Sequence, residues 1–172
     1  VDTVHKHGLE PKHLHLEITE SAYVENADQL LSVVEELKKA GFTIEMDDFG
    51  SGYSSLNMLA EMPIDMLKLD MKFVQSYAEG NNTRSIMSFV IGLAKWMNLY
   101  VIAEGVETKE QLDLLRSMDC NLGQGYYFSE PLPEKEFAKL LRKSGKTLAD
   151  AEDSTIRFSN IQDDAYQTML VV

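Results

Sequence analysis

The sequence predicts an α/β protein built as a partial (β/α)8 barrel of the TIM type, with about five of the eight βα units. Segments with strand periodicity alternate with segments of helical periodicity between residues 13 and 142, which predicts a parallel sheet. Each predicted strand also ends in polar residues suited to chemistry, and in a barrel such ends converge on one face. No G-x-G-x-x-G follows any strand, which disfavours a doubly wound sheet.

The first part of the chain predicts a helix end, a strand and a long helix. Residues 1–12 are interpreted as the end of a helix that Gly8 stops. Residues 13–19 predict a strand because apolar and polar side chains alternate. Residues 26–40 predict a helix because apolar residues recur at helical spacing, and Gly41 stands where a C-cap belongs.

The most informative stretch of the sequence is residues 42–55, FTIEMDDFGSGYSS. Its alternating start predicts a half-buried strand. The strand ends in two adjacent acids, Asp47 and Asp48, whose like charges repel and usually need a nearby cation. Gly50 and Gly52 then allow the backbone to turn tightly beside whatever these acids hold.

Three local signals mark elements in the rest of the chain. Pro63 ends a short helix, Thr108 and Gln111 form a capping box, and Pro133 suits the first position of a last helix. The predicted elements are a helix at 54–62, a strand at 65–70, a helix at 82–98, a strand at 99–104, a helix at 108–118, a strand at 121–124 and a helix at 133–142.

Polar side chains stand at the end of every predicted strand. Taken singly, an acid at a strand end is more often a helix cap or a solvated loop residue than a functional group. Their recurrence along one chain favours a common site, although Lys68 also fits a plain salt-bridge partner for the surrounding acids. The strand-end residues are Glu17, Asp47 with Asp48, Lys68 with Asp70, Glu104, and Gln124.

Some other side chains invite a functional interpretation. His13, His15 and Glu17 share a strand face, but His13 would lie about 13 Å from Glu17, too far to share a metal ion, so the histidines are interpreted as structural. Glu45 faces the same side as Asp47, so we expect it to be buried and paired, or to tune the site. Phe89, Trp96 and Met97 are expected in the core rather than at a cofactor.

Composition limits the function classes. Lys and Arg number 16 against 28 Asp and Glu, for a net charge of −12, which argues against duplex nucleic acid or anionic lipid as partners. An anionic dinucleotide still fits if metal ions invert the local field. The single cysteine, Cys120, excludes an internal disulfide and fits a cytoplasmic location. No apolar run reaches the ~18 residues of a membrane span.

Five motifs resemble the EAL domain of bacterial cyclic-di-GMP phosphodiesterases. They occur in the family's order, and the resemblance covers roughly residues 1–142: LEITES at 16–21, DDFGSGYSSL at 47–56, LKLD at 67–70, AEGVET at 103–108 and QGYYFSEPLP at 124–133. The resemblance implies an EAL domain at 1–143 that holds about the C-terminal two-thirds of the family's barrel. The Glu-Ala-Leu segment and a strand with a metal-binding Asn are expected before residue 1.

The resemblance implies a two-metal hydrolase that converts cyclic-di-GMP to linear pGpG. Hard ions such as Mg²⁺ or Mn²⁺ prefer oxygen ligands. By resemblance, Glu17 and Asp47 bind metal, with Asp47 bridging two ions and Asp48 serving the second. Lys68 would orient the attacking water, and Glu104 would act as general base or as a second-metal ligand.

Three further roles follow from the same resemblance. Glu107 would hold the glycine loop in its active position, while Asp70 and Gln124 would contact substrate. The family resemblance also implies homodimers and covalently linked sensor, GGDEF or receiver domains. Residues 144–172 are interpreted as an acidic linker that ends in TMLVV, a run resembling the first strand of a receiver domain.

Two other functions stay open at this stage. One is a non-catalytic module that binds cyclic-di-GMP or a partner domain without turnover. The other is an unrelated metal-dependent barrel hydrolase. We expect the chain alone to be inactive or very weak, because the first metal site would lack the Glu and Asn expected upstream of residue 1.

Overall fold

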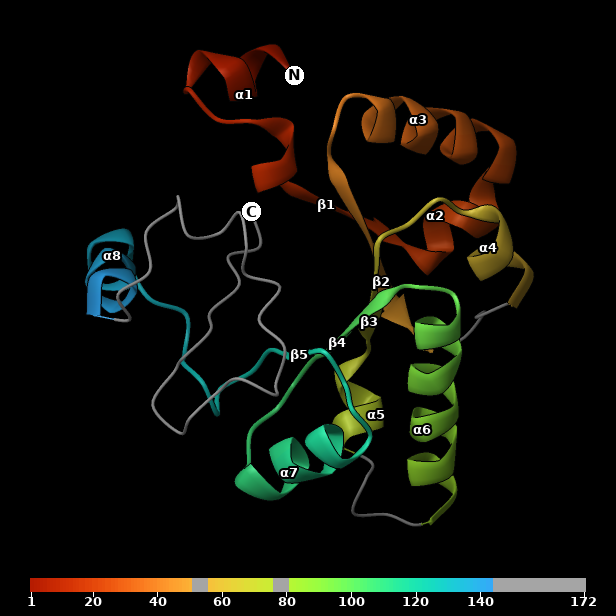
Figure 1. Ribbon diagram of the computed structural model, residues 1–172, viewed down its shortest axis with the longest axis vertical. Coiled ribbons are helices and arrows are strands. Elements are labelled where there is room, and N and C mark those ends of the chain that lie inside the picture. Colours follow the sequence, from red (N-terminus) through yellow and green to blue (C-terminus); the bar gives the residue numbers. More distant parts are fainter. Residues whose placement is uncertain (51–55, 76–80, 144–172) are drawn as a thin grey trace.

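A computed structural model describes residues 1–50, 56–75 and 81–143. Within these residues the strands form one parallel five-stranded sheet in the order β1-β2-β3-β4-β5, as the alternation predicts (Figure 1). A parallel sheet with sequential strand order is the arrangement of a partial barrel. The strands are β1 His15–Thr19, β2 Thr43–Phe49, β3 Met66–Leu69, β4 Tyr100–Ala103 and β5 Leu122–Gly123.

Helices connect successive strands, and Figure 1 shows α3, α6 and α7 spread around the sheet while α8 lies apart. Thr108 caps α7 and exchanges hydrogen bonds with Gln111, which confirms the predicted capping box. The helices are α1 Asp2–Lys6, α2 Glu20–Glu25, α3 Ala27–Lys39, α4 Leu56–Glu61, α5 Met71–Gln75, α6 Asn81–Trp96, α7 Lys109–Ser117 and α8 Glu134–Lys143.

Several local features differ from the sequence prediction. Residues 11–13 form a short 3₁₀ helix with Pro11 at its start, so β1 begins later than the predicted strand at 13–19. Helices α2 and α5 directly follow β1 and β3 and were not predicted, because five or six residues are too few to show a helical period.

Strand β2 is buried on both faces over its middle part. Ile44 and Met46 are fully buried on one side, and Glu45 is 0% exposed on the other. The prediction of a half-buried strand was therefore wrong. Parallel strands are usually covered on both sides, and here the second side carries a buried acid instead of an apolar residue.

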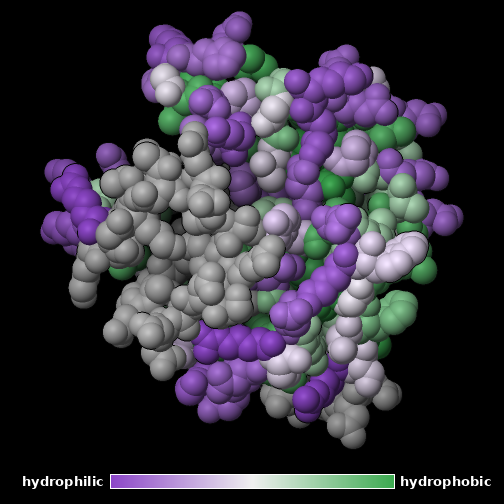
Figure 2. Space-filling model, viewed as in Figure 1, coloured by the Kyte–Doolittle hydropathy of each residue, from purple (hydrophilic) through white to green (hydrophobic). Residues whose placement is uncertain are grey.

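The prediction that Phe89, Trp96 and Met97 lie in the core was wrong for the first two. Phe89 is 65% and Trp96 84% exposed, so neither belongs to the core, whereas Met97 is partly buried against it. Helix α6 is apolar around much of its circumference, and its Met87–Ala94 face is the buried one, with the helix packing on β4. Figure 2 shows white and green residues, of intermediate and high hydropathy, on the outer surface over α6, with hydrophilic residues beside them.

The predicted linker at 144–172, with its TMLVV end, lies outside the described residues, as does part of the predicted glycine loop at 51–55. Among the described helices, none combines the length and apolar character that a bilayer crossing requires.

Cys120 lies in the core, where its thiol contacts backbone oxygens of β4 and β5, and this thiol should resist alkylation. It is 2% exposed, and burial raises its pKa to about 12, although backbone hydrogen bonds at Leu122 and Asn121 oppose the rise. At pH 8 its native thiolate fraction is then on the order of a thousandth of that in the unfolded chain. We expect iodoacetamide to label the urea-unfolded chain at least about a hundredfold faster, measured by intact mass.

The raised pKa of Cys120 also makes the free energy of unfolding depend on pH. The unfolded thiol ionises near pH 9 while the folded thiol stays neutral, so the free energy of unfolding should fall as the pH rises above about 9. Fast labelling of the native chain at pH 8 would show that Cys120 is accessible and would contradict its burial.

Candidate active site at the ends of the strands

A bulge at the end of β2 places two neighbouring acids at one site. The register with β3 shifts between Met46 and Phe49, and Asp48 has a φ of 56°. In a regular strand Asp47 and Asp48 would point to opposite faces. The bulge re-aims Asp48, and aspartate tolerates the left-handed region better than most residues do. Carboxylate oxygens of Asp47, Asp48 and Glu104 consequently lie within 4.8 Å of one another.

Lys68 connects the carboxylates of three different strands. Its Nζ lies 2.6 Å from Glu17 Oε1 on β1, 2.7 Å from Glu104 Oε1 after β4, and 3.0 Å from Asp47 Oδ1 on β2. The lysine side chain is 3% exposed. The Asp47 oxygen is within ion-pair distance but lacks hydrogen-bond geometry. One buried cation therefore faces three acids, and the cluster keeps a net negative charge.

The pKa shifts of Lys68 and Glu104 follow from that imbalance. Burial alone would lower the pKa of Lys68, but the hydrogen bonds to Glu104 and Glu17 and the nearby Asp47 carboxylate outweigh it and raise this pKa. The pKa of Glu104 is also raised, chiefly by burial and further by Asp47 and Glu17, against the opposing effect of Lys68. Both directions agree with one lysine shared among several acids, because no single acid receives its full charge.

The neighbouring loops fix the edges of the cluster. Gly50 follows the bulge with a φ of 99°, and a Cβ there would lie 1.8 Å from the Phe73 ring. Asp70 is buried, and its Oδ1 accepts from Lys72 N at 2.7 Å, which caps α5. In this structure Asp70 therefore stabilises the start of α5.

Gln124 and the Glu104–Glu107 loop are joined through the backbone. Gln124 N donates to Ala103 O at 2.9 Å, and Gln124 O accepts from Val106 N at 3.0 Å. The Gln124 Oε1 atom is buried and has no hydrogen-bond partner among the described residues. A buried, unpartnered amide oxygen on a residue bonded to the loop of Glu104 is suited to accept a hydrogen bond from a ligand.

Glu107 stands apart from the acids around Lys68. It is exposed, its Oε1 accepts from Gln75 Nε2 at 3.4 Å, and its backbone N donates to Gln111 at 2.7 Å. Its predicted role on the glycine loop involves residues 51–55, which lie outside the described residues.

The structure thus brings Glu17, Asp47, Asp48, Lys68 and Glu104 together. His13 stands in the 3₁₀ helix, where its Nδ1 accepts from Glu10 N, and it takes no part in the site. Glu45 is buried and paired, as expected, and its partner is His15. That pairing was missed, because the β1–β2 register that brings the two side chains together cannot be derived from either strand alone.

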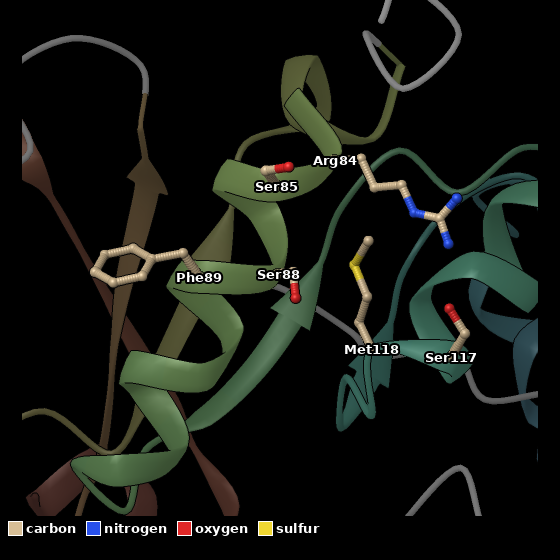
Figure 3. A pocket seen from close by; sticks show the side chains of 6 residues that line it. All are labelled: Arg84, Ser85, Ser88, Phe89, Ser117 and Met118. Atoms are coloured by element: carbon tan, nitrogen blue, oxygen red, sulfur yellow. The ribbon is translucent and has the colours of Figure 1, made fainter. Parts of the chain in front are cut away.

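A separate cleft of about 540 Å³ lies between α6 and the end of α7. It is lined by Arg84, Ser85, Ser88, Phe89, Ser117 and Met118. Figure 3 shows Arg84 reaching toward Met118 and Ser117, while the Phe89 ring points to the other side of α6. No residue of the acidic cluster lines it, so we place the candidate site at the strand ends.

A parallel sheet with acids and a lysine at the carboxyl ends of its strands defines a barrel-type protein with an acidic site whose oxygen atoms suit divalent ions. The sequence matches the EAL domain over residues 1–131. The chain therefore belongs to the EAL domain family, and the fold prediction of a partial TIM-type barrel is confirmed by its structural neighbours.

Curated relatives carry names that describe cyclic-di-GMP chemistry. The chain is 40% identical over 131 residues to the bifunctional diguanylate cyclase/cyclic di-GMP phosphodiesterase MucR of Pseudomonas aeruginosa, covering 76% of this chain and 19% of MucR. It is 42% identical over 135 residues to cyclic di-GMP phosphodiesterase NbdA of the same species, covering 78% and 17%. The chain thus spans about a fifth of the length of these relatives.

The chain also resembles solved structures of proteins in complex with cyclic-di-GMP. The MucR phosphodiesterase in complex with c-di-GMP matches with a TM-score of 0.75 and 39% identity, over 79% of this chain and 55% of that chain. BlrP1 of Klebsiella pneumoniae, in a complex with manganese and cyclic-di-GMP, matches with a TM-score of 0.72 and 34% identity, over 76% and 33%.

Proposed function

We propose that this chain carries most of the active site of a metal-dependent phosphodiesterase that hydrolyses cyclic-di-GMP to linear pGpG. The observation that carries the proposal is the acidic cluster built around Lys68 at the ends of four strands. The relatives named for this activity and the neighbours in complex with the dinucleotide support it.

The acidic cluster suits divalent ions. Its donors are carboxylate oxygens, which Mg²⁺ and Mn²⁺ prefer, and Asp47, Asp48 and Glu104 already lie within 4.8 Å of one another. With one lysine against the surrounding acids, the site retains negative charge that a cation would neutralise. We propose that Glu17 and Asp47 hold one ion and that Asp47 and Asp48 hold a second.

In the reaction, water attacks one phosphorus and the bond from phosphorus to the 3′ oxygen breaks. The 3′ oxygen takes up a proton from solvent, which leaves a linear dinucleotide with a free 3′ hydroxyl and a 5′ phosphate. Bound divalent ions would neutralise the phosphate and favour an ionised water. Lys68, fixed by three carboxylates, orients the attacking water through its Nζ protons. Glu104 is placed to accept the water proton at a carboxylate oxygen. Gln124 offers its unpartnered Oε1 to a donor on the substrate.

We also propose that the chain alone turns over slowly. The five parallel strands that the structure describes do not close a barrel of eight, and a substrate would be enclosed on one side only. The alternative function is binding of cyclic-di-GMP without cleavage, which the same acidic cluster and substrate contacts would support.

The Asp47→Asn substitution tests the proposed function. It removes one anionic ligand, so hydrolysis should fall by at least about a hundredfold. Conversion of cyclic-di-GMP to pGpG is followed by chromatography with Mn²⁺ or Mg²⁺, on the chain and on a longer natural form where the gene encodes one. Asp113→Asn on α7, remote from the cluster, is the matched control and should leave the rate unchanged.

The result also separates the two functions. Turnover that depends on Asp47 supports the phosphodiesterase. Dinucleotide binding without pGpG formation in any form of the protein would reject the enzyme in favour of the binding module.

A further inference from the structure

A second polar pair, of which only Glu45 is fully buried, lies next to the acidic cluster on the same face of the sheet. Glu45, in the middle of β2, is 0% exposed, and its Oε1 is hydrogen-bonded to Nδ1 of His15 on β1. The other oxygen, Oε2, is buried and has no hydrogen-bond partner among the described residues. Burial of a carboxylate is costly unless it is paired, so Glu45 depends on His15.

The strand register places Glu45 directly against a proposed metal ligand. In the β1–β2 pairing Glu45 lies opposite Glu17, and it precedes Asp47 by two residues on the same face. Like charges directly opposite each other on a sheet repel. The structure gives each acid its own donor, since Lys68 holds Glu17 and His15 holds Glu45.

Lys68 lies on the same face of the sheet as Glu45 and is a competing partner for it. Glu45 pairs with Met66 on β3, and Lys68 lies two residues further along the same face. With neighbouring strands about 4.8 Å apart and a rise of about 3.3 Å per residue, the two Cα atoms are about 8 Å apart, within reach of a lysine side chain. Without His15, Lys68 would be drawn toward a fourth carboxylate and its hold on Glu17 would weaken.

Stability alone does not account for the pair. A buried acid and its partner can often be replaced by apolar residues at little cost, and an apolar residue at 45 would match Ile44 and Met46 beside it. We propose that His15 is a positioning residue. By binding Glu45 it prevents this carboxylate from competing for Lys68, so that Lys68 keeps Glu17 oriented toward the metal site. This inference rests on the function proposed above.

A double-mutant cycle on Mn²⁺ binding tests this role. The variants are His15→Leu, Glu45→Ala and the two combined, and free Mn²⁺ is measured by electron paramagnetic resonance during titration. His15→Leu should weaken Mn²⁺ binding by about tenfold or more, as loss of a supporting residue does. The double variant should return to within about threefold of the parent chain, because the competing carboxylate is gone.

His13→Leu is the matched control. It also removes a histidine from this segment and a hydrogen bond to Glu10, so it can lower stability, but it should leave Mn²⁺ affinity unchanged. Unchanged affinity in His15→Leu, or a double variant that binds as weakly as His15→Leu, would overturn the positioning role and leave a purely structural pair.

A crystal structure of metal-free His15→Leu gives a readout independent of metal. We expect Lys68 Nζ to contact Glu45 in place of Glu17. An unmoved contact between Lys68 and Glu17 rejects the inference. If the parent chain binds no Mn²⁺, the metal site proposed above fails by itself, and this structure alone decides the role of His15.

Discussion

Replacing Lys68 by methionine should lower the free energy of unfolding of the metal-free chain by about 3–5 kcal/mol. Methionine fills a similar volume but leaves Glu17, Asp47 and Glu104 facing one another without their cation. Each of these side chains is largely shielded from water, with exposures of 20–22%, so solvent screens the repulsion only in part. Turnover of cyclic-di-GMP should be lost as well, because the water loses its orienting donor.

Urea unfolding with a chelator, and again with Mn²⁺, measures this effect. Ions bound among the same acids should restore part of the loss, since about 2.7 kcal/mol is gained at a hundred times the dissociation constant. Lys72→Met is the control, because its side chain is 76% exposed and its change should stay within about 0.5 kcal/mol. Equal midpoints for the Lys68 and Lys72 variants would show that the buried lysine does not balance the acids.

The residues of the site that could be predicted from the sequence are those at the carboxyl ends of the strands. In a sequential parallel sheet the carboxyl ends of neighbouring strands meet, so Glu17, Asp47, Lys68 and Glu104 had to converge once the strand order was known. The alternation of strands and helices was enough for that step. Roles for these residues stay predictions until hydrolysis and metal binding are measured.

The remaining features depend on three-dimensional packing. Strand periodicity alone would send Asp48 to the opposite face, and only the bulge against β3 turns it toward Asp47. The His15–Glu45 pair depends on the register between two strands. Phe89 looks like a core residue in the sequence, yet which face of an apolar helix is buried is decided by its contact with β4.

Replacing Gly125 by alanine should destabilise the chain by about 3 kcal/mol and displace Gln124. A Cβ at this position would lie 2.2 Å from Val106 O and 2.4 Å from Val106 N, so rigid backbone would have to move. The φ of 157° is a further strain for a residue with a side chain. Val106 N donates to Gln124 O, so moving this contact shifts the strand end that carries Gln124 away from the Glu104 loop.

The matched control for this substitution is Gly92→Ala, in the exposed middle of α6, where a Cβ meets nothing within 4 Å. Alanine there should stabilise the chain by about 0.5–1 kcal/mol, because glycine loses more backbone entropy in a helix. Chemical denaturation measures the free energy of unfolding of both variants. A decrease for Gly125→Ala together with an increase for Gly92→Ala would show that the effect at 125 comes from the close approach of Val106 and not from the loss of a glycine as such. A stable Gly125→Ala chain that keeps its dinucleotide affinity would mean that the two loops can separate without cost to the site.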